Sequence, residues 1–257
     1  MIELLEKLVG IPSVSREEGA AADFLQEYMT GRGLEVHRRG HNLWVESEPE
    51  SDRPCILLNA HIDTVKPAAS YTIDPFKPVH ADGRLYGLGT NDCGGALVAL
   101  LEAYCSLTAR PQPYRLVFSA TAEEEVSGNG GIEMILPEIG RVDLGIIGEP
   151  TGMQPAVAEK GLMVLDCIAH GVSGHAAREE GVNAIYEALQ DIEWFRSYRF
   201  SKVSDFVGPV KMSVTMINAG TQHNVVPDSC KFVVDVRNNG LYTNEELLAE
   251  IRSHISC

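Results

Sequence analysis

The chain has 257 residues, which is enough for one large domain or two smaller ones with a substantial hydrophobic core. Its 36 acidic and 21 basic residues give a formal net charge of −15, which repels polyphosphate and anionic lipid. We therefore expect no nucleic-acid partner and no membrane partner. The six cysteines form no C-x-x-C pair, and no signal peptide or membrane span is recognisable, so a reduced, cytoplasmic protein is predicted.

Helix and strand alternate through the first 150 or so residues. Helical spacing and capping residues predict helices at 2–9, from Ser15 to about Gly33, and at 94–107. Strand-like runs lie at 34–38, 43–46, 55–59, 115–119 and 144–147. The last two runs are short, mainly apolar and bounded by turn residues, and they are expected to be central strands covered on both faces. This order predicts an α/β domain with a mostly parallel sheet flanked by helices.

The pattern changes after Pro155, where apolar and polar residues alternate along two segments. The apolar positions are Val210, Met212, Val214 and Met216 in one segment and Phe232, Val234 and Val236 in the other. Period-two alternation predicts antiparallel strands with one solvent-exposed face. With helices expected at 183–195 and 244–255, the order is that of a small α+β sandwich without its closing strand. We place the two domains at 1–155 and 156–257.

Acidic and imidazole side chains follow the predicted strands of the first domain, where open α/β sheets place their sites. They are His61 and Asp63 after CILLN, Asp92 in GLGTNDCGG, Glu123-Glu124-Glu125 after RLVFS, and Glu149 in GEPT. Taken singly, they could be a surface histidine, a helix cap or a solvated charge run. Taken together, they favour a pair of metal ions, which mixed histidine and carboxylate ligation with a bridging aspartate would hold. Asp63 is expected to hold the second imidazole nitrogen of His61.

These segments resemble those of the metallopeptidases that include acetylornithine deacetylase, succinyl-diaminopimelate desuccinylase, aminoacylase and carboxypeptidase G. The matching segments are NAHIDTV, GLGTNDCGG, TAEEE and GEPT, and the resemblance runs from the first helix to the last residue. It implies a zinc-peptidase-like fold with an inserted ferredoxin-like lid and dimerisation domain. It also implies two zinc ions, or cobalt or manganese in their place.

The resemblance implies roles for the acidic and imidazole residues named above in the first domain. His61 and Glu149 would hold one metal ion, and Asp92 would bridge it to a second ion held by Glu125. Glu124 would be the general acid and base, and Asp63 would orient His61. Glu123 stands where the family more often has aspartate, a difference that we interpret as neutral.

The second domain resembles the family's lid in the segments HGVSGHAA, HNVVPD and VDVR. The resemblance implies that His175 reaches the partner subunit's active site and stabilises the tetrahedral oxyanion. It also implies that Asn224 and Arg237 hold the substrate, with the arginine on a carboxylate. Alternatively, His175 is a turn histidine, and Arg237 is a solvent-facing strand residue on the same face as Lys231 and Asp235.

The function implied by this resemblance is removal of an N-acyl group from an amino acid by a homodimer. GEPT and GHAA favour the acetylornithine deacetylase branch, which acts in arginine biosynthesis. A succinyl-amino-acid deacylase, a di- or tripeptidase, or a truncated non-catalytic dimerisation protein are the alternatives. The family returns to its first domain after the lid and supplies one more histidine ligand there, whereas this chain ends at Cys257. We therefore expect the return segment to be missing and this chain alone to be weakly active or inactive.

Overall fold

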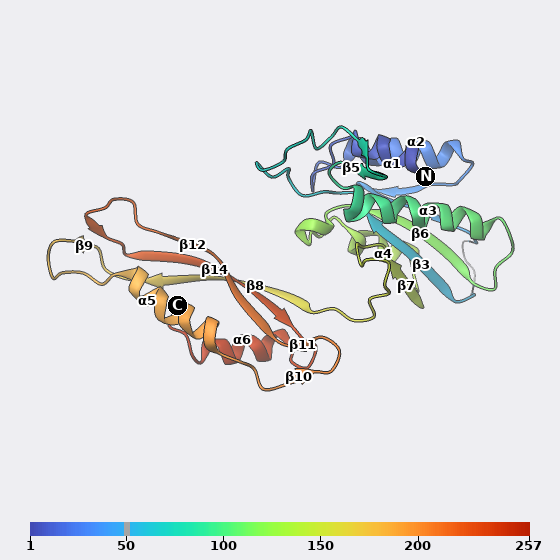
Figure 1. Cartoon of the computed structure of the whole chain (residues 1–257). Helices are drawn as coiled ribbons and strands as arrows, with labels where there is room; N and C mark the ends of the chain where they lie inside the picture. The colour runs from blue at the N-terminus through green and yellow to red at the C-terminus, as the bar shows by residue number, and fades with distance from the viewer. Residues whose placement is uncertain (49–51) are drawn as a thin grey trace. The chain divides into compact units, whose positions relative to one another are not determined.

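The structure is a computed structural model that describes residues 1–48 and 52–257. It divides into two compact units, Met1–Gln154 and Pro155–Cys257, called here the first and second units. Each has its own cluster of buried apolar side chains, and each is described by itself (Figure 1). Among the described residues, no helix has the length and apolar character needed to cross a membrane.

A five-stranded mixed sheet forms the centre of the first unit (Figure 1). Its strands, in spatial order, are β1 (His37–Arg39), β2 (Asn42–Glu46), β6 (Arg115–Thr121), β3 (Cys55–His61) and β7 (Leu144–Ile147). β3 runs parallel to both β6 and β7, whereas the β1–β2 and β2–β6 pairs are antiparallel. The prediction of a mostly parallel sheet is therefore wrong for half of the pairings. The tight turn at Gly40 and His41 explains the antiparallel β1–β2 pair, because so short a connection joins only antiparallel strands.

Apolar side chains cover both faces of the central strands. The helices of this unit are α1 (Ile2–Val9), α2 (Gly19–Gly31), α3 (Gly95–Thr108) and α4 (Ile132–Ile139). On one face, Phe118 of β6 lies in a cluster with Leu97 and Leu101 of α3. On the other face, Val117 clusters with Ile135 of α4. Every residue of β6 is buried, as predicted for the run at 115–119.

The β7 strand differs from its prediction. Leu144, Ile146 and Ile147 are 53%, 45% and 55% exposed, although a central strand covered on both faces was expected. The physical reason is the position of β7 at the edge of the sheet, where β3 is its only neighbour among the described strands. An apolar run of four residues identifies a strand, but it does not reveal whether a second neighbour covers it.

Shorter elements complete the first unit. β4 (Val79–Ala81) and β5 (Arg84–Tyr86) form a hairpin that the sequence analysis did not predict. Two short helical turns, η1 (Thr90–Gly94) and η2 (Glu124–Val126), carry acidic residues of the predicted metal site.

The second unit is a three-stranded antiparallel sheet with two helices packed on it. The strand order is β12 (Lys211–Ala219), β14 (Ser229–Asn238) and β8 (Gly161–His170), and the helices are α5 (Ala184–Ser197) and α6 (Asn244–Arg252). Two short pairs extend it: β9 (Gly174–His175) with β13 (Val225–Val226), and β10 (Val203–Ser204) with β11 (Gly208–Pro209). The main elements follow in the predicted order of strand, helix, strand, strand, helix.

The predicted alternation holds along β14 but fails in β12. Phe232, Val234 and Val236 are fully buried beneath the helices. Met216 was expected to share the buried face with Val214, yet it is 66% exposed. The strand register shifts between these two residues, so a β-bulge at this point turns Met216 to the open face.

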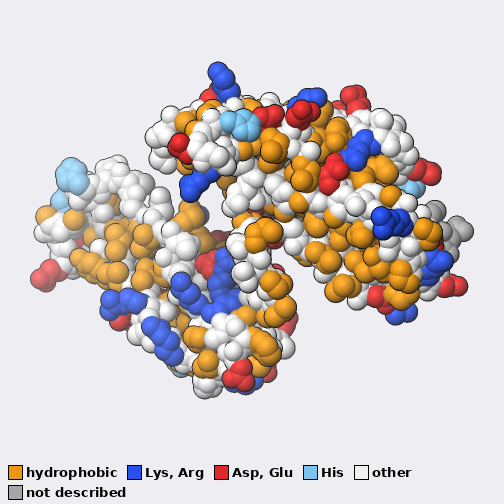
Figure 2. Space-filling view, turned by 45° about the vertical axis from the view of Figure 1, so that its right-hand side comes forward, with side chains coloured by type: hydrophobic (Ala, Val, Ile, Leu, Met, Phe, Trp, Pro, Cys, Tyr) orange, Lys and Arg blue, Asp and Glu red, His pale blue; other side chains and the backbone are white. Residues whose placement is uncertain are grey.

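Charge is dispersed over the face of the molecule that Figure 2 shows. On the face seen in Figure 2, Asp and Glu side chains lie among Lys, Arg and hydrophobic side chains, and they form no single acidic patch. The net charge of −15 is therefore not concentrated on this face.

Candidate metal centre

Three parallel strands bring the predicted site residues to one edge of the first unit's sheet. His61 ends β3, the acidic triplet follows β6, and Glu149 follows β7. Because β3 is parallel to both neighbours, these carboxyl-terminal ends meet at the same edge. Asp92 comes from η1, immediately before α3.

The imidazole of His61 lies at the centre of these residues. Its side chain is 1% exposed, and its Nε2 is 3.1 Å from an Asp92 carboxylate oxygen. The same nitrogen is 3.9 Å from a carboxylate oxygen of Glu124 and 3.9 Å from one of Glu149. One buried nitrogen therefore faces three carboxylates.

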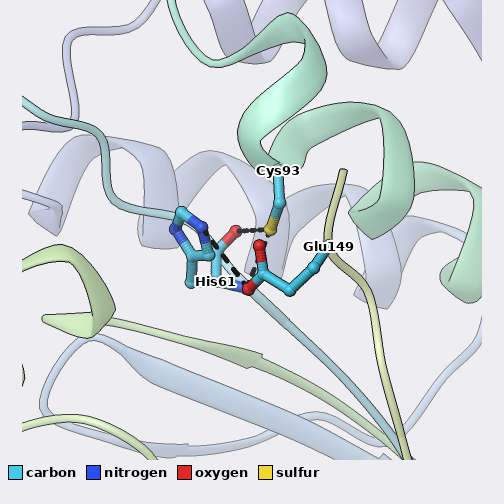
Figure 3. Close-up of side chains that lie close together, drawn as sticks. All are labelled: His61, Cys93 and Glu149. Carbon is cyan, nitrogen blue, oxygen red and sulfur yellow. Dashed lines mark hydrogen bonds and ion pairs between the residues drawn. The ribbon is translucent and has the colours of Figure 1, made fainter. Parts of the chain in front are cut away.

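Two overlapping groups of side chains have metal-ligand geometry. Ligand atoms of His61, Asp92 and Glu125 all lie within 4.8 Å of one another, and so do those of His61, Cys93 and Glu149. Figure 3 shows the second group, with the Cys93 sulfur and the Glu149 carboxylate directed toward His61. The structure thus brings together the four predicted metal ligands, His61, Asp92, Glu125 and Glu149, and the predicted general acid and base, Glu124.

The sequence analysis did not predict a role for Cys93. The backbone N–H of His61 donates to the Cys93 sulfur over 3.2 Å, and the thiol donates back to the His61 carbonyl oxygen over 3.2 Å. Burial raises the pKa of this thiol, which keeps it protonated and able to donate. Its position directly after Asp92 in the glycine-rich segment was the available signal, but a buried cysteine was the simpler interpretation.

Asp63 contacts His61 differently from the expectation. The His61 Nδ1 lies 2.8 Å from the backbone carbonyl oxygen of Asp63 and 3.4 Å from its carboxylate. The carboxylate instead accepts the Ser15 hydroxyl at 2.7 Å and the backbone N–H groups of Glu124 and Glu125 at 3.1 and 3.2 Å. Asp63 therefore orients the imidazole chiefly through its backbone, while its side chain fixes the loop of the acidic triplet.

The pKa shifts describe a site in which several carboxylates surround a single imidazole. Burial, with repulsion from neighbouring carboxylates, raises the pKa of Glu149 to about 7 and also raises that of Glu125. Burial by itself lowers the pKa of His61, but interactions with the side chains of Asp63 and Cys93 outweigh it and raise the pKa to about 12. Carboxylate oxygens and an imidazole nitrogen are donors that zinc-type ions accept, so a cation fits this site chemically and electrostatically.

The metal-free protein is expected to lose conformational stability as the pH rises from about 5 to about 8. The pKa of Glu149 is raised from 4.5 to about 7 in the folded state. Its stabilising contribution is therefore fully present below the unfolded pKa and is lost as the pH rises through 7. The raised pKa of His61 acts in the same direction at higher pH. Since the Glu149 side chain is 33% exposed, screening limits its effect to on the order of 1 kcal/mol.

Thermal unfolding of chelator-treated protein at pH 5.5 and pH 8 would measure this effect. We expect a melting temperature lower by about 2–4 °C at pH 8. Saturating zinc should remove the decrease, because the ligands bind metal in their deprotonated form. A metal-free protein that becomes more stable between these pH values would contradict the expectation.

The remaining predicted residues lie in the second unit. His175 of β9 pairs with Val225 of β13, and the carbonyl oxygen of Asn224 accepts the N–H of Ala176 at 3.0 Å, so the His175 and Asn224 segments are adjacent. Arg237 lies toward the other end of β14, where its Nε and one Nη contact Asp235 at 2.9 and 3.0 Å. The structure therefore does not bring Arg237 beside His175 and Asn224.

Comparisons with known proteins match both units. The M20 family model for a peptidase dimerisation domain matches residues 157–256, and the model for peptidase family M28 matches residues 42–146. A succinyl-diaminopimelate desuccinylase from Paracoccus denitrificans is 29% identical over 98% of this chain and 70% of its own length. An acetylornithine deacetylase from Proteus mirabilis is 29% identical over 92% of this chain and 66% of its own length.

Solved structures have the same fold. An M20 family metallo-carboxypeptidase from Sulfolobus solfataricus superposes with a TM-score of 0.75 at 15% identity, covering 98% of this chain and 74% of that one. A dinuclear metal-binding peptidase of the M20 family from Bacillus subtilis has a TM-score of 0.64 at 18% identity, covering 98% and 67%. These similarities and the clustered ligand atoms agree with a metal-binding hydrolase. The chain is thus similar to M20 peptidases in the family model of its second unit, in its relatives and in its fold.

Proposed function

We propose that the protein hydrolyses the amide bond of an N-acyl amino acid with two metal ions, zinc being the expected metal. The observation that carries this proposal is the arrangement at His61, whose buried Nε2 faces Asp92, Glu124 and Glu149 within 3.9 Å. His61, Asp92 and Glu149 would hold one ion, and Asp92 and Glu125 the other. When bound, the ions would polarise the amide carbonyl and lower the pKa of the attacking water.

Glu124 is the residue that we propose as general base and acid. Its side chain is 54% exposed, and its carboxylate lies 3.9 Å from His61 Nε2. It is therefore close to the ligands yet accessible to solvent. Such a carboxylate would take a proton from the attacking water and deliver it to the leaving amine.

The second unit would complete the site in a homodimer. The match of residues 157–256 to a dimerisation-domain model supports this assembly. We assign His175 to stabilise the oxyanion in the partner subunit's site, and Asn224 to hold the substrate. Arg237 would bind a substrate carboxylate, for which it must exchange part of its contact with Asp235.

N-acetylornithine is the first candidate substrate, as the sequence segments favour. N-succinyl-diaminopimelate is the second candidate, supported by relatives of that name at 26–29% identity. Both substrates place the scissile amide next to an amino-acid carboxylate, which Arg237 suits. The proposal therefore covers linear N-acyl amino acids, with the acyl group to be determined by experiment.

The test is amine release from a small set of substrates. Protein loaded with zinc, cobalt or manganese would be incubated with N-acetylornithine, N-succinyl-diaminopimelate and a dipeptide. Although at most weak activity is expected from this chain alone, we expect the measured rate with one of the two acyl amino acids to exceed that with the dipeptide at least about tenfold, a difference of about 1.4 kcal/mol in transition-state binding. A chelator should abolish the reaction. Metal-loaded protein that binds an acyl amino acid without cleaving it would favour the non-catalytic alternative.

A further inference from the structure

A buried carboxylate outside the metal centre contacts the loop that carries Glu124 and Glu125. Glu18 precedes α2 and has no exposed surface. One of its carboxylate oxygens accepts the backbone N–H of Arg16 at 2.6 Å and that of Glu123 at 3.2 Å. The other lies 2.8 Å from His41 Nδ1. A buried carboxylate is costly unless its oxygens are paired, and these contacts pair both.

The contacted loop has a conformation that ordinary side chains adopt rarely. Glu123 and Ser127 have φ values of +56° and +47°, although neither is glycine. Backbone strain of this kind is unfavourable and persists only where the surroundings enforce it. The side chain of Glu123 lies against Gly128 and Gly130, where an added Cβ would come within 1.9 and 2.3 Å of its carboxylate oxygens. External contacts must therefore hold this turn in place.

Two buried carboxylates, those of Glu18 and Asp63, supply these contacts to three consecutive residues. The N–H of Glu123 donates to Glu18, and those of Glu124 and Glu125 donate to Asp63. Three successive backbone N–H groups are thus fixed by acceptors from two other segments of the chain. Asp63 is already tied to His61, whereas Glu18 is tied to α2 and, through His41, to the turn between β1 and β2.

We propose that Glu18 is a positioning residue for the loop 123–125. Its carboxylate fixes the first residue of the strained turn, so that the next two residues direct their side chains toward His61. This proposal rests on the proposed function, because that function gives Glu124 its role as general base and Glu125 its role as metal ligand. The hydrogen bonds from Glu18 belong to the chain itself, however, and can be tested without metal or substrate.

The test compares Glu18→Gln with Glu17→Gln, which removes an exposed neighbouring charge. Amide hydrogen exchange of the metal-free proteins is measured residue by residue. We expect exchange at Glu123, Glu124 and Glu125 to become at least about tenfold faster in Glu18→Gln, as local opening becomes easier. Exchange in β3 and α3 should not change. In Glu17→Gln, all of these rates should match the wild type.

A second measurement uses cobalt, whose visible absorption reports the ligands around it. If Glu18 positions Glu125, the cobalt spectrum of Glu18→Gln should differ from that of the wild type at equal occupancy. The proposal would be overturned if the faster amide exchange were confined to residues 16–22, or if no exchange rate changed. If Glu18→Gln does not fold, Glu18→Asp keeps the charge but shortens the reach, and the same rates decide. Wild-type protein that binds no cobalt would reject the proposed function, while the exchange rates would still test the role of Glu18.

Discussion

Replacement of Glu124 by glutamine is expected to lower the rate of amide hydrolysis by about 10²–10⁴-fold, the usual contribution of a general base. Glutamine has nearly the same shape but cannot accept a proton from the attacking water. The Glu124 side chain is 54% exposed, compared with 53% for Asp92 and 33% for Glu149, and it belongs to neither ligand group. The variant should therefore retain its metal.

The matched control is Glu133→Gln, which removes an exposed carboxylate from α4. Turnover and metal content are measured on the same preparations. The control should match the wild type in both measurements. If Glu124→Gln lost metal together with activity, Glu124 would be a ligand and not the base. If it retained full activity, the general base would have to be another group.

Replacement of His61 by alanine is expected to remove most of the bound metal. His61 is the residue shared by both ligand groups, and its side chain is the buried centre of the site. Outer-shell changes already weaken metal binding by about 10–100-fold, so loss of this ligand should weaken it by at least about 100-fold. Elemental mass spectrometry after removal of loosely bound metal measures the ratio of metal to protein.

His223→Ala provides the control for this measurement, because His223 is an exposed histidine of the second unit. It should bind as much metal as the wild type. Chelator-treated His61→Ala should also be less stable than chelator-treated wild type at neutral pH, since the carboxylates lose their nearest cationic partner. Equal metal content in His61→Ala and wild type would show that the metal lies elsewhere.

Residues at strand ends were predictable because local pattern and sheet geometry agree. The apolar run at 115–119 had to be a covered strand, and the acids after it had to lie at its carboxyl end. The position of Asp92 near His61 could also be predicted, because the glycine-rich segment leads directly into a helix. These inferences need only short stretches of sequence and the rule that parallel strands end together.

Features that depend on distant pairing were not predictable. The exposure of β7 depends on which strands flank it, and the outward turn of Met216 depends on one register shift against β14. The antiparallel contact of β2 with β6 joins residues such as Leu43 and Ala120, which are far apart in the chain. The contacts of the Asp63 carboxylate and of Glu18 likewise arise only when several segments meet.

The structure explains how glutamate fits at position 123, where the resembling family more often has aspartate. The residue takes a left-handed conformation, and its longer side chain reaches the glycines of the following turn, where it also accepts the N–H of Gly130 at 3.4 Å. Small residues at Gly128 and Gly130 leave the space that this glutamate occupies. Glutamate at position 123 is thus accommodated locally, and the interpretation that the difference is neutral stays a prediction.

The parallel arrangement of β3 with β6 and β7 also determines when the metal centre forms during folding. Parallel neighbours need long crossover connections, so the chain from His61 to Glu149 must be closed before the ligands meet. We therefore expect the centre to be completed late, after most of the first unit has been ordered. A bound ion would link segments that the unfolded chain keeps apart, and its binding energy would stabilise the finished unit far more than any partly folded form.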